Sequence, residues 1–275
     1  MSLILLGLIQ GLTEFLPVSS SGHLVLAKYF LNLPLPGASF EAFLHLASVL
    51  AVIIMFKEEI MKLLKSFFSS IQQLFIGEKF SIILMKDRYS KLAWFLIIST
   101  IPTALIGYNL EKYIELLFDN ILVIPLMLFI TGTLLRFSDK HYRKGNKNIS
   151  NINVRDALFI GLAQAVAIIP GISRSGLTVM AGMQRGLERE FAAKYSFMLS
   201  IPIILGAAFF KFEDLGSLNL DFNCLILPGI VTFTSSYWAM RIFIRLLVNQ
   251  KVSFLSCYLW VLALFTFPLI LLKGV

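Results

Sequence analysis

The chain has 275 residues, of which 57% are hydrophobic and only 15% are charged, and its mean hydropathy is +0.82. An ordinary soluble domain has about 45–50% apolar and about 25% charged residues, so this composition excludes that class and indicates a polytopic membrane protein. The net charge is +8. No groove of basic and aromatic residues is evident from the sequence, so we do not expect the chain to bind nucleic acid.

Residues 1–30 form an apolar segment that is interrupted near its middle by Leu16–Gly22, a run with one proline, three serines and one glycine. We interpret this segment as a re-entrant helix-turn-helix hairpin. Non-helical backbone at membrane depth is tolerated only inside protein or beside a wet cavity, so the turn should face away from lipid. The segment has no charge before Glu14 and no small-residue cleavage site, so we do not expect a cleaved signal peptide.

Six later stretches have the apolar character and the length, about 17 to 25 residues, of transmembrane helices. They are residues 40–57, 91–109, 119–137, 191–211, 223–245 and 254–272. Residues 58–90 are amphipathic and carry charges of both signs, which predicts an interfacial helix and loop. Cys224 and Cys257 lie in apolar stretches without metal-ligand spacing, so we expect both to be buried.

Residues 154–187 are a second interrupted apolar segment, and they repeat the pattern of the first. The pattern Gly-Leu-x-Gln, then eight residues, then Ser-x-Ser-Gly begins at Gly7 and again at Gly161, 154 residues later. Pro170 and Gly171 break this segment at its middle. A chance match is one explanation; a true repeat predicts a second re-entrant hairpin.

The chain therefore divides into two halves within a single membrane domain, 1–275. Repeat 1 covers 1–137, a polar linker covers 138–153, and repeat 2 covers 154–275. Each half has one hairpin and three spans, and because three is odd, the second half enters the membrane from the opposite side. The predicted fold is an all-α integral membrane protein with six transmembrane helices and two re-entrant helical hairpins in an inverted repeat. The two turns should meet at the repeat interface, where inverted-repeat transporters bind their ligands.

Positive charges are distributed unevenly along the chain. Most of the 24 Lys and Arg residues fall in four segments that the six-span topology puts on one face. These segments are 57–91, 136–155, 185–194 and 241–251. By the positive-inside rule this face is cytoplasmic, and both termini lie outside.

The first turn carries the polar groups of a hydrolytic site. Gln10 and Glu14 are four residues apart and share one face of a helix. Ser19, Ser20 and His23 follow, and carboxylates, hydroxyls and imidazoles are the groups that nucleophilic and acid–base catalysis use. Each group also has a structural interpretation. Glu14 could be a neutral buried acid, His23 a core histidine, and the serines partners of the backbone.

The second turn puts Arg174 between Ser173 and Ser175, just before a predicted helix. A guanidinium fork, hydroxyls and helix N-terminal N–H groups together favour a phosphate group. Arg174 could instead extend to the membrane interface. Glu41 and His45 share a helix face at the start of the first span, so they either line the outer mouth of the site or form an ordinary interfacial pair.

Two longer segments around these turns resemble a known family. Gln10–His23 (QGLTEFLPVSSSGH) and Pro170–Thr178 (PGISRSGLT) resemble the two signature motifs of the bacterial undecaprenyl-diphosphate phosphatases, also called bacitracin resistance proteins. The resemblance implies a membrane hydrolase that removes one phosphate from undecaprenyl diphosphate and so recycles the carrier lipid for peptidoglycan synthesis. It also implies a bacterial plasma-membrane location, a site on the extracytoplasmic side, dependence on a divalent cation such as Mg²⁺ or Ca²⁺, and bacitracin resistance.

The resemblance also implies roles for the residues at the motif positions. Glu14 would be the catalytic and metal-associated carboxylate, Ser20 the nucleophile, His23 the proton-transfer partner and Arg174 the diphosphate clamp. The family's first motif opens with Glu or Gln, and Gln10 in this chain leaves Glu14 as the main acid for a cation. The contacts to the polyprenyl diphosphate lipid would be Gln10, Ser19, Ser21, Ser173, Ser175 and Thr178.

Three questions stay open at the level of the sequence. Either Ser20 or His23 could be the nucleophile, and the protein could be a monomer or a homodimer in the bilayer. Opposed re-entrant hairpins are also a transport architecture, so a transporter or flippase is the main alternative function. Hydrolysis needs a nucleophile and a proton-transfer group beside the phosphate clamp, whereas transport needs only the clamp and a gate.

Overall fold

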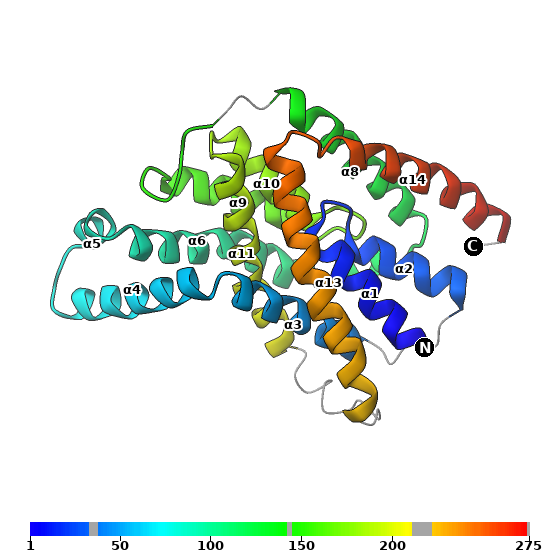
Figure 1. Cartoon of the computed structure of the whole chain (residues 1–275), viewed down its shortest axis with the longest axis horizontal. Helices are drawn as coiled ribbons and strands as arrows, with labels where there is room; N and C mark the ends of the chain where they lie inside the picture. The colour runs from blue at the N-terminus through cyan, green and yellow to red at the C-terminus, as the bar shows by residue number, and fades with distance from the viewer. Residues whose placement is uncertain (33–37, 142–144, 211–221, 274–275) are drawn as a thin grey trace.

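The computed structural model describes residues 1–32, 38–141, 145–210 and 222–273. These residues form thirteen helices and no strand, which confirms the all-α prediction (Figure 1). The helices are α1 (Ser2–Phe15), α2 (Ser20–Leu31), α3 (Ala38–Met55), α4 (Lys57–Phe75), α5 (Phe80–Lys86), α6 (Arg88–Asn109), α7 (Glu111–Asp119), α8 (Val123–His141), α9 (Val154–Val166), α10 (Arg174–Gln184), α11 (Arg189–Phe210), α13 (Phe222–Val248) and α14 (Phe254–Lys273).

Three of the described helices are long and apolar enough to cross a membrane: α6, α14 and residues 189–209 of α11. Two bent pairs would each supply one more crossing if counted together, namely α3 with α4, bent by 89°, and α7 with α8, bent by 101°. Each of the six predicted spans overlaps one described helix over most of its length, although six membrane crossings stay a prediction. The span predicted at 119–137 starts too early, because the chain turns at Asn120, whose side-chain oxygen accepts a hydrogen bond from the Leu122 N–H (3.2 Å).

Both interrupted segments are helix-turn-helix hairpins, as predicted: α1 with α2, and α9 with α10. Ser19 and Ser173 are the N-cap residues that follow the two turns. The Ser19 hydroxyl accepts a hydrogen bond from the Gly22 N–H (3.3 Å), and the Ser173 hydroxyl accepts one from the Gly176 N–H (3.2 Å). The serine and glycine of the repeated pattern therefore start a helix in the same way twice.

Each hairpin packs against a helix of the other half of the chain. Helix α1 lies along α13, and α9 lies along α6 (Figure 1). Thr232 donates a hydrogen bond to the Gly7 carbonyl (3.0 Å), and Thr103 donates one to the Gly161 carbonyl (3.3 Å). The same threonine-to-glycine contact thus occurs twice, once for each copy of the pattern. This correspondence supports a true repeat and argues against a chance match.

The prediction that Cys224 and Cys257 are buried is wrong, since both are free and exposed. They lie on α13 and α14, and α14 exposes Val261, Leu264 and Phe265 as well. Lipid tails are as apolar as leucine, so the outer face of a membrane helix is apolar too. Apolar neighbours in the sequence therefore do not distinguish the interior of such a protein from its surface.

The linker between the halves is shorter than predicted, because α8 continues to His141. The described part of the linker that follows residue 144 contacts the second hairpin at Asp156. This residue belongs to α9, and its carboxylate is fully buried. Lys147 Nζ and Arg185 Nε each lie 2.9 Å from this carboxylate. Removing one partner of such a buried charge is costly, so these ion pairs hold the linker against the ends of α9 and α10.

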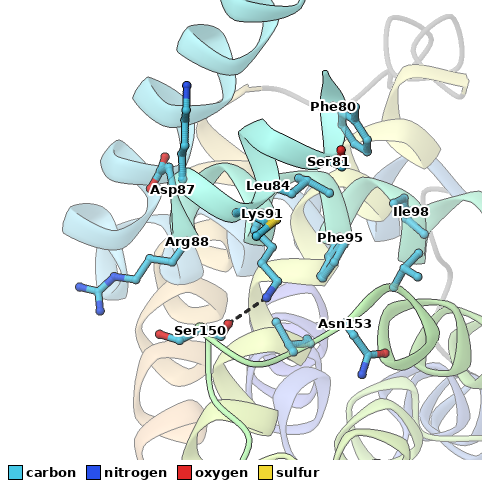
Figure 2. A pocket seen from close by; sticks show the side chains of 14 residues that line it. Phe80, Ser81, Leu84, Asp87, Arg88, Lys91, Phe95, Ile98, Ser150 and Asn153 are labelled. Carbon is cyan, nitrogen blue, oxygen red and sulfur yellow. Dashed lines mark hydrogen bonds between the residues drawn. The ribbon is translucent and has the colours of Figure 1, made fainter. Parts of the chain in front are cut away.

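A cavity of about 920 Å³ lies between α5, α6 and the linker (Figure 2). Its walls are apolar at Leu84 and Phe95, and Lys91 donates a hydrogen bond across it to the Ser150 carbonyl (2.9 Å). None of the residues that line it belongs to the two repeated turns. The cavity is therefore not the site that the sequence predicts.

We predict that Gly161→Ala destabilises the protein, because an added Cβ would lie 2.4 Å from the Ser99 carbonyl oxygen where α9 crosses α6. Overpacking of this kind costs about 1–3 kcal/mol. The matched control is Gly206→Ala, where an added Cβ meets nothing within 4 Å. Thermal unfolding in detergent should show a lower midpoint for Gly161→Ala only. An equal effect of both changes would contradict the close helix contact.

Candidate active site

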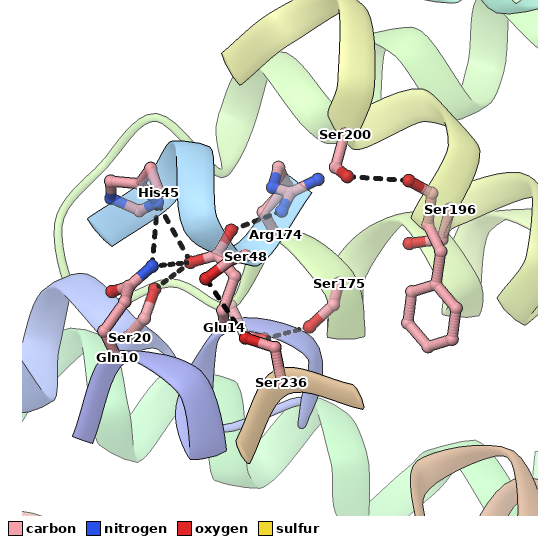
Figure 3. Close-up of polar contacts among 12 residues, drawn as sticks. Gln10, Glu14, Ser20, His45, Ser48, Arg174, Ser175, Ser196, Ser200 and Ser236 are labelled. Carbon is pink, nitrogen blue, oxygen red and sulfur yellow. Dashed lines mark hydrogen bonds and ion pairs between the residues drawn. The ribbon is translucent and has the colours of Figure 1, made fainter. Parts of the chain in front are cut away.

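Glu14, near the end of α1, is the centre of a compact polar cluster (Figure 3). Its side chain is only 4% exposed. Arg174 Nη2 donates to Oε1 over 2.6 Å, and Ser20 Oγ donates to Oε2 over 2.6 Å. Gln10 Nε2 donates to the same Oε2 over 3.0 Å. Four residues that the sequence singled out therefore meet at one carboxylate.

The two turns lie against each other, which confirms the prediction that they meet. Ser175 Oγ donates to the Leu16 carbonyl (3.1 Å), and the Gly171 N–H donates to Ser21 Oγ (3.5 Å). The first residues of α2 and α10 are Ser20 and Arg174, which occupy equivalent positions of the repeat, 154 residues apart. The repeat therefore presents a hydroxyl from one turn and a guanidinium from the other to the same carboxylate.

The backbone of the first turn is strained at the residue before the predicted nucleophile. Ser19 has a φ of 70°, a left-handed conformation that costs a non-glycine residue of order 1–3 kcal/mol. Its counterpart Ser173 has an ordinary φ of −80°. Strained residues of this kind cluster at functional sites, where the surrounding structure holds them. Ser20, the next residue, donates its hydrogen bond to Glu14.

The other predicted substrate contacts lie in the two turns and the start of α10. Among the described residues, none of these hydroxyls bonds to the Glu14 carboxylate, so their contact with substrate stays a prediction. They bond to one another or to neighbours, Ser19 to Ser21 and Ser173 to Ser175 at 3.3 Å, and Thr178 to Ser196 at 2.6 Å.

His23 lies on α2, and its hydrogen bonds lead away from the cluster. Its Nδ1 lies 2.8 Å from the Ser19 carbonyl oxygen, and its Nε2 lies 2.6 Å from the Tyr258 hydroxyl. The ring also stacks on the Tyr258 ring with 5.7 Å between centroids. The hydroxyl of Ser20 thus has the Glu14 carboxylate as its partner in this conformation, not the His23 imidazole. Tyr258 lies outside both repeated motifs, so the sequence did not indicate this contact.

His45 of α3 belongs to the cluster, which the sequence left undecided. Its Nδ1 lies 2.9 Å from Gln10 Nε2 and 3.3 Å from Glu14 Oε2. The second residue of the predicted pair, Glu41, bonds to Lys28 instead. The four-residue spacing on α3 indicated a shared helix face, but it could not identify a partner 31 residues earlier in the chain.

The cluster has the charge and the donors that a phosphate group needs. One carboxylate and one guanidinium offset each other, and α2 and α10 both begin at the cluster, so two helix N-termini lie beside it. The Ser20 and His45 side chains are partly exposed. The arrangement suits transfer of a phosphate to or from the Ser20 hydroxyl.

The oxygen atoms of the cluster also suit a hard divalent cation that takes some of its ligands from the protein and the others from a substrate. Gln10 Oε1 is buried and has no hydrogen-bond partner among the described residues. Within the same residues there is no group of three or more His, Cys, Asp or Glu side chains that could hold a metal alone. Mg²⁺ typically binds through one or two carboxylates plus substrate phosphates, so Glu14 with the free amide oxygen fits such a cation.

Comparison with known proteins agrees with this chemistry. A family model described as "Bacitracin resistance protein BacA" matches residues 3–265. A protein named undecaprenyl-diphosphatase from Methanobrevibacter smithii is 41% identical over 96% of this chain and 95% of its own length. A protein of the same name from Thermosipho africanus is 42% identical over 97% of this chain and 99% of its own length. Because these matches cover nearly the whole chain, it belongs to the BacA family of bacitracin resistance proteins.

Proposed function

We propose that this chain is an undecaprenyl-diphosphate phosphatase, which removes the terminal phosphate of undecaprenyl diphosphate and leaves undecaprenyl phosphate. The names of its relatives support this substrate. The observation that carries the proposal is the Glu14 carboxylate, which lies 2.6 Å from both the Ser20 hydroxyl and the Arg174 guanidinium. A hydroxyl beside a carboxylate is a nucleophile with a proton acceptor, and a guanidinium binds phosphate oxygens.

In the first step, Ser20 Oγ attacks the terminal phosphorus of the lipid. The Oγ–P bond forms while the bond between that phosphorus and the bridging oxygen breaks, and undecaprenyl phosphate leaves. The Ser20 proton passes to Glu14 Oε2, which accepts its hydrogen bond, and from there to the departing phosphate. A guanidinium has five N–H donors, so Arg174 can donate to the oxygens of the transferring phosphate and stabilise their charge.

In the second step, water attacks the phosphoserine. The P–Oγ bond breaks, one proton of the water returns to Oγ through Glu14, and inorganic phosphate leaves with the remaining hydroxyl. His23 is the other candidate for proton transfer, and it would have to leave the Ser19 carbonyl and the Tyr258 hydroxyl to take part. If His23 were the nucleophile, the phosphate would be found on its imidazole instead.

The reaction is proposed to depend on a divalent cation, Mg²⁺ or Ca²⁺. Glu14 and Gln10 would hold it together with the phosphate oxygens of the substrate, and the cation would neutralise charge on the diphosphate. Glu14 also accepts a hydrogen bond from Arg174, so the carboxylate would serve both the guanidinium and the cation.

The membrane arrangement that we propose has six transmembrane helices (α3, α6, α8, α11, α13 and α14) and two re-entrant hairpins. The hairpin helices have 11 to 14 residues. At 1.5 Å per residue this is at most about 21 Å, which is shorter than the roughly 30 Å of the hydrocarbon core. Exposed apolar side chains on α4 and α7, such as Phe68 and Leu116, support an interfacial position for both helices.

The proposed location is the inner membrane of a bacterial cell, with the site open to the extracytoplasmic side. There the enzyme would return the carrier lipid to the monophosphate form that peptidoglycan synthesis reuses. Bacitracin resistance, from which the family takes its name, would follow from a larger supply of that monophosphate.

Phosphate release from undecaprenyl diphosphate by the purified protein tests the function. We expect Ser20→Ala to reduce release to the background rate, because the nucleophile is missing. Arg174→Ala should reduce kcat by about 10²–10³-fold, the effect of removing a donor that stabilises transition-state charge. Ser69→Ala, which changes an exposed serine of α4, is the control and should match the unchanged protein. Lipid binding without phosphate release by the unchanged, folded protein would reject the proposal and favour transport.

Removal of divalent cations by a chelator should lower phosphate release, and added Mg²⁺ or Ca²⁺ should restore it. Gln10→Glu adds a second carboxylate beside Glu14, so it should lower the cation concentration that gives half-maximal activity. The measurement is a cation titration of both proteins at a fixed substrate concentration. Full activity in excess chelator would contradict a role for the cation.

Single cysteines test the proposed orientation, in a protein whose exposed Cys224 and Cys257 are first changed to serine. Lys112→Cys on α7 should react with a membrane-impermeant maleimide in intact cells. Asn146→Cys in the linker should react only after the cells are opened, since the linker lies on the cation-rich face. Both positions are exposed. The reverse pattern of labelling would invert the orientation.

A further inference from the structure

His45 contacts the catalytic carboxylate from a helix that belongs to neither turn. Its Nδ1 lies 3.3 Å from Glu14 Oε2 and 2.9 Å from Gln10 Nε2, and Gln10 Nε2 itself lies 3.0 Å from Glu14 Oε2 (Figure 3). The three side chains therefore close a triangle of polar contacts around one carboxylate oxygen. The His45 side chain is 30% exposed, whereas that of Glu14 is 4% exposed.

The tautomer of the imidazole decides which of its two contacts is a hydrogen bond, because Gln10 Nε2 can only donate. With the proton on Nδ1, His45 donates directly to Glu14, and its contact with Gln10 is not a hydrogen bond. With the proton on Nε2, the bare Nδ1 accepts from the Gln10 amide, whose second N–H bonds to Glu14. His45 is therefore attached to the carboxylate directly or through Gln10 in both cases.

The two oxygens of Glu14 have different partners, and the proposed chemistry needs one of them to face Ser20. Oε1 accepts from Arg174, and Oε2 accepts from Ser20. The terminal torsion of a glutamate is broad, so the side chain alone does not fix the plane of the carboxylate. The contacts of Gln10 and His45 are both to Oε2, so they mark the oxygen that faces the nucleophile.

The equivalent position of the second half lacks this contact. Phe43 and Phe197 are 154 residues apart in α3 and α11, and on the same spacing His45 corresponds to the buried Leu199. Glu14 corresponds to Ile168 in the same way. The imidazole is thus present only in the half that has the carboxylate, so the packing of the repeat does not require it.

We infer that His45 is a positioning residue of the active site: together with Gln10, it holds Glu14 Oε2 toward Ser20 while Arg174 engages the phosphates of the substrate. When Arg174 turns its donors to the diphosphate, its contact with Oε1 weakens, and the contacts at Oε2 keep the carboxylate in place. This inference rests on the proposed phosphatase function.

The test compares His45→Leu, His45→Asn and the unchanged protein by steady-state phosphate release from undecaprenyl diphosphate. Leucine keeps similar bulk and removes both ring nitrogens, whereas asparagine keeps a nitrogen or oxygen near the place of Nδ1. We expect His45→Leu to lower kcat by about 10²-fold with little change in KM, the cost of a catalytic group displaced by about 1 Å. His45→Asn should recover most of that loss.

The control is Glu41→Gln, one helical turn away on α3, which removes the partner of Lys28 outside the cluster and should keep kcat near its original value. Thermal unfolding of each variant in detergent verifies the fold, and His45→Gln replaces His45→Leu if the latter does not fold. Equal kcat losses in the Leu and Asn variants, a change in KM alone, or an unchanged kcat would each overturn the role of His45. Inactivity of the unchanged protein would instead reject the phosphatase function.

Discussion

The ion pair between Glu14 and Arg174 is the contact on which the site depends. A carboxylate that is only 4% exposed is costly to keep charged without a partner, and removing one member of a buried pair costs about 3–5 kcal/mol. The two residues are 160 positions apart in the chain and meet only when the two turns touch. The packing of the two hairpins and the pairing of Glu14 with Arg174 therefore depend on each other. A change that separates the turns would also leave a buried charge without its partner.

The repeat determines the backbone arrangement around the site, and the side chains that differ between its two halves provide the polar groups. Both turns start a helix with a capping serine, and both hairpins pack on a helix of the other half. At three equivalent positions the side chains differ: Glu14 and Ile168, Ser20 and Arg174, His45 and Leu199. The first half therefore brings the hydroxyl and the carboxylate, and the second half brings the guanidinium. One site results, although the backbone pattern is present twice.

The sequence predicted the helical hairpins, because the repeated serines and glycines are local signals for helix starts. It predicted the meeting of their turns because three spans in each half make the second hairpin enter from the opposite side. It also singled out Glu14 and Arg174, since charged groups in apolar segments need partners, and the two side chains contact each other. It did not predict the 101° bend between α7 and α8, the exposure of Cys257, or the contact between His23 and Tyr258. These depend on which helix faces are neighbours in space. Hydropathy does not contain that information when lipid and protein interior are equally apolar.

The most direct test of the account is chemical trapping of the intermediate. The protein would be mixed with undecaprenyl diphosphate that carries a radioactive terminal phosphate, quenched within milliseconds to seconds, and mapped by mass spectrometry. The account predicts labelled phosphate on Ser20, and no labelled protein when Ser20 is changed to alanine. Label on His23, or phosphate release with no labelled protein at any time, would contradict attack by the hydroxyl that Glu14 holds.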